Sequence, residues 1–448
     1  MSAETELATF AATLSFDDVL EPVRSHARLV VADTVAAMVG GSTDPDVRGF
    51  VDGACERTPG SATVVGHDAT TSRYLAAFAG GASGTVLELD EGHKYAAGHP
   101  AIHVLPALLA DWEVDDGSGD DLLVSFVAGY EAAARAGRAC QPLAEGYHPH
   151  GVWGPVGAAV GVAVNRGYDA ATVEQAARIA AKDAQHTLMA AATEGATVRQ
   201  AFAGGANLSG LLAADLAAAG FSGVDDGIAR HLDLAVEGTV DRDALGADLG
   251  ERWEVTQGYF KRHAACRYTH PTIDAVDALL ESGLDPATVD GVRVETYPAA
   301  AALTETRPSS ALQAKFSVPF AVATRLVHGT SGKPAFVADA IDEPTLALAD
   351  RVEVVATDEM RDRLPDQRSA RVTVTTTDGS TRSEKVVHAA GGAERPYEES
   401  VVREKFTDLV GPVLGTDSAN DLWAATREGP ADSTTLFELL RSGDGELG

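Results

Sequence analysis

The sequence predicts a mainly α-helical protein with a smaller α+β domain. From Leu20 to about Leu280 the apolar residues recur at helical spacing. After His270 short stretches alternate between polar and apolar residues, which is typical of strands. Helical spacing returns after Gly391-Gly392, and the length of 448 residues favours two domains. We therefore expect a large helical domain over 1–268 and 393–448, and an α+β domain over 269–392.

The first part of the chain contains a series of predicted helices, many of them rich in Ala and Gly. Helical periodicity is found in residues 29–39, 74–87, 106–112, 121–135, 157–164, 170–192 and 198–219. Small residues let helix backbones approach closely. These segments therefore predict an internal helical core.

The second part combines helices and strands. Residues 271–280 and 316–327 have helical spacing, whereas 289–297 and 351–357 are predicted strands. Residues 369–388 alternate around Asp378-Gly379, which is a hairpin signal. The following segment EESVVREKFTDLV predicts a helix that packs back on the first domain.

The charge of the chain excludes some partners. It has 35 Lys+Arg against 66 Asp+Glu, a formal net charge of -31. Such a field repels nucleic acids and anionic membrane surfaces, so we expect neither as a partner. The acidic, lysine-poor and alanine-rich composition is typical of a surface adapted to high salt, and it predicts a halophilic protein.

The cysteines and the chain start indicate the compartment. The three cysteines, Cys55, Cys140 and Cys266, lie far apart, which argues against a disulfide framework, a CxxC zinc site and an iron-sulfur cluster. The first residues lack a basic region and a long apolar core, so they do not resemble a signal peptide. No stretch reaches the length of uninterrupted apolar residues that a membrane span needs. We expect a cytoplasmic protein.

Five segments without acidic residues contain most of the unusual polar residues. They carry His, Lys or Arg side chains, and they cover 92–110, 146–168, 195–214, 255–273 and 306–338. Buried helices also lack acids, but that does not explain the basic and imidazole groups. The pattern predicts that these segments converge on a locally positive pocket for a small anion.

Carboxylates and histidines occur together in LELDEGHKYAAGHPAIH, residues 87–103. A carboxylate can orient an imidazole that titrates near neutrality, which suits general acid/base catalysis. His99 precedes Pro100, so it is expected in a loop before a helix. His99 and His103 also have the i, i+4 spacing of zinc ligands, but the HExxH glutamate is absent, and we expect no metal.

Two further segments carry candidate residues. In GYHPHGVWGPVGAA the loop histidines His148 and His150 flank a proline before a predicted helix, where backbone N–H groups can meet an anion. The run YFKRHAACRYTHP is the densest basic stretch of the chain. Cys266 within it could be a nucleophile, but its neighbours His263 and His270 are equally plausible anion binders.

The order of these motifs resembles the MmgE/PrpD family over nearly the whole chain. The matching pieces are DTVAAMVGG, ELDEGHKYAAGHP, GYHPHGVWGPVGAA, VRQAFAGGANLSGLLAADLAAAGFSG, FKRHAACRYTHPTIDA, QAKFSVPFAVA and REKFTDLV. Members include 2-methylcitrate dehydratase, cis-aconitate decarboxylase and an iminodisuccinate epimerase. The resemblance implies a helical domain with an α+β lid, a homodimer, and chemistry without a metal or organic cofactor.

The resemblance also implies site residues. The family's acidic stretch falls on Glu88, Asp90 and Glu91, its HP histidine on His99 and its loop histidine on His148. A family lysine is replaced by Arg199, the junction lysine and histidine fall on Lys261 and His270, and a family tyrosine becomes Phe320. Arg199 keeps the positive charge but cannot transfer protons, since a guanidinium stays protonated. We expect catalytic roles for Asp90, His99, His148, Lys261 and His270, and substrate-binding roles for Glu88, His93, Arg199, Cys266 and Phe320.

The expected function is that of a cofactor-independent lyase on a small di- or tricarboxylate. Abstraction of a proton α to a carboxylate needs a base of near-neutral pKa and cations that hold the developing charge. A hydro-lyase of the 2-methylcitrate dehydratase type is the first expectation, and a decarboxylase or epimerase of the same family is the alternative. A metal-dependent hydrolase and a non-catalytic anion-binding protein are more remote alternatives.

Overall fold

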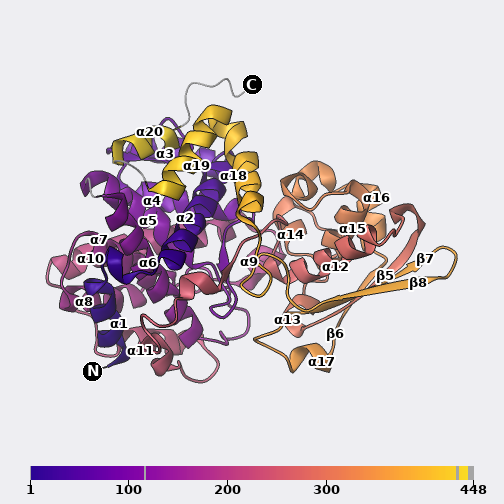
Figure 1. The fold of residues 1–448 in the computed structure, drawn as a ribbon, viewed down its shortest axis with the longest axis horizontal. Helices are drawn as coiled ribbons and strands as arrows, with labels where there is room; N and C mark the ends of the chain where they lie inside the picture. The colour runs from indigo at the N-terminus through magenta and orange to yellow at the C-terminus, as the bar shows by residue number, and fades with distance from the viewer. Residues whose placement is uncertain (1, 116–117, 430–432, 442–448) are drawn as a thin grey trace.

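The computed structural model describes residues 2–115, 118–429 and 433–441. Figure 1 shows two parts side by side: a large bundle of helices that contains the N-terminus, and a smaller part built on a sheet. The fold is mainly α with a smaller α+β part, as the sequence predicts.

The helical part is formed by both ends of the described chain. Its helices are α1 (Ala3–Thr13), α2 (Glu21–Gly41), α3 (Pro45–Arg57), α4 (Arg73–Val86), α5 (Pro100–Asp115), α6 (Gly119–Ala139), α7 (Gly154–Asn165), α8 (Ala170–Ala181), α9 (Met189–Thr193), α10 (Ala201–Ala218), α11 (Gly227–Leu232), α18 (Glu399–Leu414), α19 (Thr416–Glu428) and α20 (Ser433–Leu440). Two short antiparallel ribbons join them, β1 (Ala62–Thr63) with β2 (Thr70–Thr71), and β3 (Gly92–His93) with β4 (Gly258–Tyr259).

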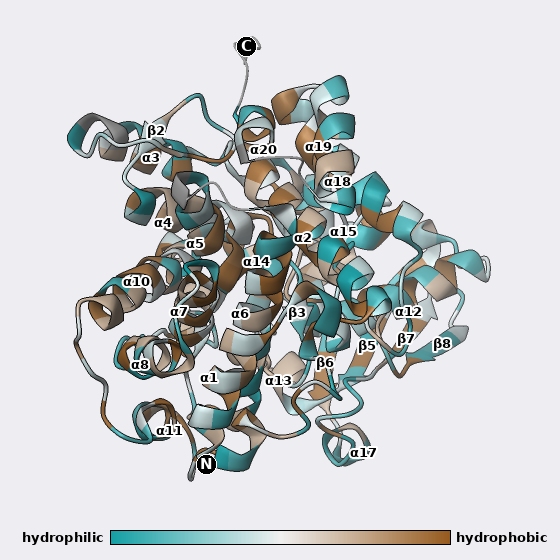
Figure 2. Cartoon of the chain, turned by 60° about the vertical axis from the view of Figure 1, so that its left-hand side comes forward, coloured by the Kyte–Doolittle hydropathy of each residue, from teal (hydrophilic) through white to brown (hydrophobic). Residues whose placement is uncertain are grey.

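The core of this part consists of α4, α5, α6, α7 and α10, which pack on one another. In Figure 2 much of α5 is brown, because its residues are apolar and buried. Gly204 of α10 lies against α4 so closely that a Cβ there would be 2.5 Å from the carbonyl oxygen of Phe78. The predicted close approach of small-residue helices is confirmed.

Helix α10 is the central example of an apolar core helix. The stretch Thr197–Ala218 is long and apolar enough for a membrane span by length and composition. However, 56% of its most apolar window is buried inside the protein. This burial is what a core helix of a globular fold requires.

The C-terminal helix α18 packs on α2, far away in sequence. Its residues Phe406 and Val410 are buried in the same core as α2. Lys405 Nζ lies 2.6 Å from Asp33 Oδ1 of α2 and 2.5 Å from the carbonyl oxygen of Leu89. The predicted return of the tail to the helical part is confirmed, and it supports the segment just before Asp90.

The smaller part, which we call the lid, has a four-stranded mixed sheet. Its elements are α12 (His270–Glu281), β5 (Val289–Thr296), α13 (Pro298–Ala301), α14 (Ala311–Lys315), α15 (Val318–His328), α16 (Glu343–Ala349), β6 (Val352–Ala356), α17 (Asp358–Arg361), β7 (Ala370–Thr376) and β8 (Thr381–Val386). The strand order is β6-β5-β7-β8, with β5 and β6 parallel and the other pairs antiparallel.

The sheet register follows the alternation in the sequence. Val294 pairs with Val372, and β7 alternates between buried and half-buried residues. Helices α12 and α15 cover the buried face, while the edge strand β8 is mostly exposed and polar. The hairpin predicted at Asp378-Gly379 is confirmed, with Gly379 at φ 83° in the left-handed region that the turn requires.

Three predicted helix boundaries are wrong by six residues or more. Helix α2 begins at Glu21, eight residues before the predicted start at residue 29. The helix expected over 170–192 ends at Ala181, because the next segment bonds to another loop instead of to itself. Gln185 N–H donates to the carbonyl of Gly151, and the Thr187 hydroxyl lies 2.9 Å from the carbonyl of His150. Helix α5 begins at Pro100, six residues before the predicted start, and contains Pro106 in its interior.

Candidate active site

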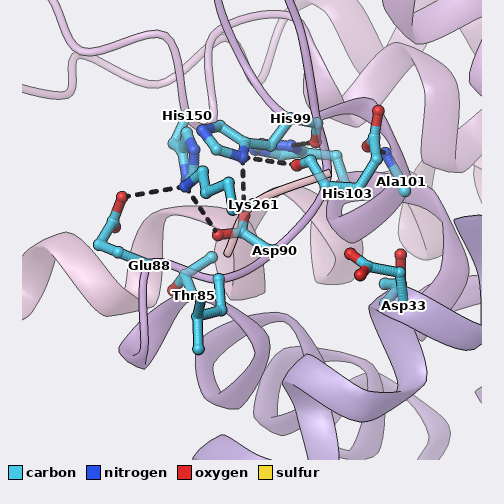
Figure 3. A network of polar contacts seen from close by, with 12 residues as sticks. Asp33, Thr85, Glu88, Asp90, His99, Ala101, His103, His150 and Lys261 are labelled. Carbon is cyan, nitrogen blue, oxygen red and sulfur yellow. Dashed lines mark hydrogen bonds and ion pairs between the residues drawn. The ribbon is translucent and has the colours of Figure 1, made fainter. Parts of the chain in front are cut away.

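Seven polar side chains from distant segments meet in the interior next to α14. We call them the Asp90 cluster, and they are Glu88, Asp90, His99, His148, His150, Arg199 and Lys261. All seven are buried, and His99 is the most exposed at 8%. Figure 3 shows Asp90 between His99 and Lys261.

The central pair of the cluster is Asp90 with His99. His99 Nδ1 lies 2.9 Å from Asp90 Oδ2 and 2.6 Å from the carbonyl oxygen of Glu91. Both neighbours are acceptors, so Nδ1 carries a proton and Nε2 is the atom left for other partners. Burial alone would raise the pKa of Asp90, but His99 and Lys261 together hold it well below its ordinary value. Asp90 is therefore ionised and orients the His99 ring through Nδ1.

Two cations share the carboxylate of Glu88. Lys261 Nζ lies 3.3 Å from Glu88 Oε2 and 3.4 Å from Asp90 Oδ1. Arg199 forms an ion pair with Glu88 Oε1 and donates to the carbonyl of Thr85 at 3.1 Å. Glu88 has φ 54°, a left-handed conformation that costs a residue other than glycine roughly 1–2 kcal/mol. Its ion pairs offset this cost.

The two loop histidines are held beside His99 in neutral form. The His150 ring centroid lies 4.5 Å from that of His99 and 4.7 Å from that of His148. Burial, followed by the charges of Arg199 and His99, lowers the pKa of both loop histidines well below 6.5. Within the described protein neither ring nitrogen of His150 has a hydrogen-bond partner.

The loop conformation explains its glycines. Gly151 has φ 85°, and its N–H donates to His103 Nε2 at 3.1 Å. A Cβ on Gly154, the first residue of α7, would lie 2.2 Å from the His103 ring. His103 Nδ1 donates to the carbonyl of His99 at 2.7 Å. His103 thus fixes the loop against α5, and neither of its ring nitrogens is free to bind a metal with His99.

Three donor atoms of the Asp90 cluster lie as close together as metal ligands do. Ligand atoms of Asp90, His99 and His150 lie within 4.8 Å of one another. Lys261 and Arg199 already supply positive charge at the neighbouring carboxylates. A divalent ion would be repelled by these cations, so the set fits poorly as a metal centre.

The lid closes the cluster with α14 and the residue after it. Lys315 Nζ donates to the carbonyl of Val86 at 2.7 Å. The Phe316 ring centroid lies 5.5 Å from the Arg199 guanidinium and 6.4 Å from the His148 ring. Burial lowers the pKa of Lys315 to about 8. The lid therefore supplies an apolar wall and a further cation next to Glu88.

All five acid-free segments contribute to this site. They supply His99, the loop histidines, Arg199, Lys261 and the Lys315-Phe316 pair. The site is not free of carboxylates, however. Glu88 and Asp90 lie just before the first acid-free segment and pair with Arg199 and Lys261, which come from two other acid-free segments.

Two family models match the chain. The MmgE/PrpD N-terminal domain matches residues 5–233, and the MmgE/PrpD C-terminal domain matches residues 263–427. The chain belongs to the MmgE/PrpD family. The resemblance of the motifs is thereby confirmed.

Relatives of the family match over nearly the full length. A cis-aconitate decarboxylase-like protein of Aspergillus oryzae is 28% identical over 99% of this chain and 97% of its own. Two cis-aconitate decarboxylases of Aspergillus terreus are 25% and 26% identical, each over 97% of this chain and 95% of their own.

Two of the expected site residues lie in other surroundings. His270 Nε2 donates to the carbonyl of Ala265 at 3.1 Å, and its Nδ1 lies 3.3 Å from Arg267 Nη1, so both ring nitrogens are used locally. His93 Nε2 lies 3.1 Å from Glu254 Oε2, and its Nδ1 accepts from the N–H of Ala96. These geometries do not place His270 or His93 in the Asp90 cluster.

The other two expected binding residues contribute no free polar group. Phe320 is fully buried, with its ring centroid 6.0 Å from that of Phe336 in the hydrophobic core. Cys266 is a free thiol whose pKa burial raises to about 11, so it is not a thiolate nucleophile at neutral pH. Cys140 is also free, and the Cys55 side chain lies outside the described part.

Sequence reasoning named His150 only beside His148 in the loop and gave it no role in the expected site, and it missed Lys315 and Phe316 as site residues. His150 is two residues after His148 in the same loop, and Lys315-Phe316 lies within the last acid-free segment. The signal was therefore present in the segments. Only the packing of the lid on Arg199 distinguishes Lys315 from the other lysines.

Proposed function

We propose that this MmgE/PrpD protein is a lyase that acts on a small di- or tricarboxylate, with His99 as the group that transfers the proton. The observation that carries this proposal is the buried pair of ionised Asp90 and His99 beside two neutral histidines. A carboxylate at Nδ1 orients the imidazole, and Nε2 of His99 is then the atom that can deliver a proton.

Unpartnered buried atoms indicate where substrate oxygens bind. Arg199 Nε and both ring nitrogens of His150 are buried without a hydrogen-bond partner in the described protein. A buried donor left unpaired costs about 1–3 kcal/mol, and a bond to a substrate carboxylate removes that cost. Lys261 lies beside these atoms, and Glu88 pairs with both Lys261 and Arg199.

Decarboxylation of a cis-aconitate-like tricarboxylate is the reaction we place first. It is supported by the names of the relatives that match over the full chain. In this step a carboxylate leaves as carbon dioxide, and its bonding electron pair moves into the adjacent double-bond system. His99 then protonates the far carbon of the former double bond, so charge and atoms balance.

Dehydration is the second candidate reaction for the same site. The neutral imidazole of His150, whose ring nitrogens have no hydrogen-bond partner in the described protein, can accept a proton α to a carboxylate, and His99 can assist the loss of hydroxide. His148 positions His150, because His148 Nδ1 accepts the N–H of His150. The expected 2-methylcitrate dehydratase-type reaction stays a prediction. Both reactions need only groups that the chain itself supplies. We also propose a homodimer as the active form.

A panel of small di- and tricarboxylates in D2O, followed by NMR, tests the proposal. A decarboxylase releases carbon dioxide and leaves one deuterium in the product, and a hydro-lyase forms an unsaturated product by loss of water. Exchange of a carbon-bound proton for deuterium with inversion of configuration, and without loss of water or carbon dioxide, would identify an epimerase. Saturable binding without turnover or exchange would contradict the lyase proposal, and activity lost to a chelator would favour a metal-dependent enzyme.

A further inference from the structure

A second polar pocket lies outside the Asp90 cluster, where the lid meets the helical part. We call it the junction pocket, and its polar lining is Lys94, Tyr259, Arg267, Arg368, His388 and Glu394. The cavity is about 40 Å³, which exceeds the roughly 10–15 Å³ that one water requires. It can therefore hold a few waters or one small oxyanion.

Among the described residues, two arginines in this pocket have no acidic partner. In the described part of the chain, neither Arg267 nor Arg368 has a carboxylate within ion-pair distance. Arg267 donates to the carbonyls of Ala390 at 2.8 Å and Ala389 at 3.0 Å. Arg368 Nη2 donates to the carbonyl of Lys94 at 2.5 Å. Both guanidinium groups keep further N–H donors.

The pocket carries a net positive charge in a strongly negative protein. Lys94 forms an ion pair with Glu394, and His388 Nδ1 lies 3.7 Å from the same carboxylate oxygen. Glu394 thus offsets one cation, and Arg267 and Arg368 remain unbalanced. In a chain of net charge -31, carboxylates are abundant, so two unbalanced half-buried arginines indicate an external anion.

The lining residues of the junction pocket come from both the lid and the helical part, so the pocket forms only where these two parts meet. Lys94 and Tyr259 belong to the helical part, Arg267 to the junction, and Arg368 and His388 to the lid. The Arg267 guanidinium lies 4.3 Å from the Tyr259 ring centroid, and the His99 ring centroid lies 6.3 Å from that same centroid. An anion here would connect the lid to a residue that packs against His99.

We propose that the junction pocket is a binding site for a small oxyanion, held by the guanidinium groups of Arg267 and Arg368. Guanidinium groups bind carboxylate and phosphate oxygens through paired N–H donors, so the ligand is inorganic phosphate or a small carboxylate. The inference does not rest on the proposed function, because none of these residues belongs to the Asp90 cluster.

Calorimetric titration of the full-length protein with inorganic phosphate, and separately with malonate, tests the site at constant ionic strength. We expect saturable binding of at least one anion. Arg368→Gln should weaken it at least tenfold, and Lys94→Met should weaken it because Glu394 then faces the anion without its partner. The matched control is Arg382→Gln, since Arg382 is an exposed lid arginine that bonds the Ser282 carbonyl.

The outcomes identify which anion binds and show whether it binds in the junction pocket. Phosphate binding that Arg368→Gln weakens identifies a free oxyanion, and malonate binding with the same dependence identifies a carboxylate. His99→Asn should leave the affinity unchanged. Absence of saturable binding of both anions, or wild-type affinity in both the Arg368 and the Lys94 variants, would overturn the proposal, as would an affinity lost in His99→Asn alone.

Discussion

The ammonium group of Lys315 lies 2.7 Å from the carbonyl oxygen of Val86, across the boundary between the lid and the helical part. Val86 ends α4 two residues before Glu88, and Lys315 ends α14 just before Phe316. This bond therefore fixes the wall of the Asp90 cluster that the lid provides.

Removal of this bond should impair catalysis more than folding. We expect Lys315→Met to lower kcat/KM about tenfold, because the Phe316 wall over Arg199 loses its anchor and a 1.4 kcal/mol loss corresponds to that factor. Steady-state kinetics and thermal unfolding would be measured together. Lys333→Met, at an exposed lid lysine, is the control and should leave the kinetics unchanged. Equal kinetics in both variants would contradict the role of Lys315.

Loss of either site imidazole should abolish most turnover. His99→Ala and His148→Ala, made singly, are expected to lower kcat by about 10²–10⁴, the usual contribution of a positioned acid or base. Circular dichroism should show an intact fold. The control is His231→Ala on α11, where the ring bonds the Gly227 carbonyl of its own helix. Rates close to wild type in both site variants would rule out the assignment.

Asp90 can be compared with a matched pair elsewhere. His263 Nε2 lies 3.0 Å from Asp274 Oδ1, a distance close to the 2.9 Å between His99 Nδ1 and Asp90 Oδ2, and this second pair lies outside the cluster. Asp90→Asn and Asp274→Asn should each destabilise the protein by about 3–5 kcal/mol, the typical effect of breaking a buried pair. Only Asp90→Asn should also remove turnover per folded molecule. Similar activity losses in both variants would indicate a purely structural role for Asp90.

Glu91 should make stability fall as the pH rises. Burial raises its pKa from 4.5 to about 8, and Tyr130 donates to the carboxyl at 2.6 Å. Between these two values the folded protein binds a proton that the unfolded chain does not bind, so stability decreases by up to about 1.4 kcal/mol per pH unit. Above about pH 8 both states are ionised and this contribution stays constant.

Glu91→Gln removes this titration and should flatten the dependence. Urea unfolding at several values between pH 5 and 8 would measure it, with the slope compared to wild type, in which Glu131 contributes as well. The amide also loses an acceptor for the N–H of Ala101, but that loss is the same at every pH. Parallel curves for the two proteins would show that Glu91 is not the group responsible.

Salt should stabilise the protein strongly. With a net charge of -31, repulsion between surface carboxylates grows when screening weakens. We expect the melting temperature to fall steadily as the salt concentration drops below the molar range. Melting curves at low and high potassium chloride would measure this, and equal melting temperatures would contradict the proposed salt adaptation.

Much of the fold followed from local patterns. Helical spacing predicted α2, α4, α6 and α12, and alternation around Asp378-Gly379 predicted β7 and β8, because these periodicities depend on neighbours in sequence. The end of α8 at Ala181 was missed, since the next residues bond to the loop that carries His150. Tertiary hydrogen bonds there override a helical sequence.

The sequence by itself determined the family and the order of the elements, because the order of motifs can be read directly from the chain. It also identified the candidate site residues from their chemistry, namely Asp90, His99, His148, Arg199 and Lys261. Only the tertiary structure decided their partners. It paired Glu88 with Arg199 and Lys261, separated by more than a hundred residues, and it added His150 and Phe316 to the site.

The tertiary structure also placed His93, His270 and Phe320 outside the cluster. Burial and pairing set the charge of an ionisable group, and both depend on residues that are distant in the chain. The total charge of the protein is thus a property of its sequence. Which cations stay unbalanced, as at Arg267 and Arg368, is a property of its packing.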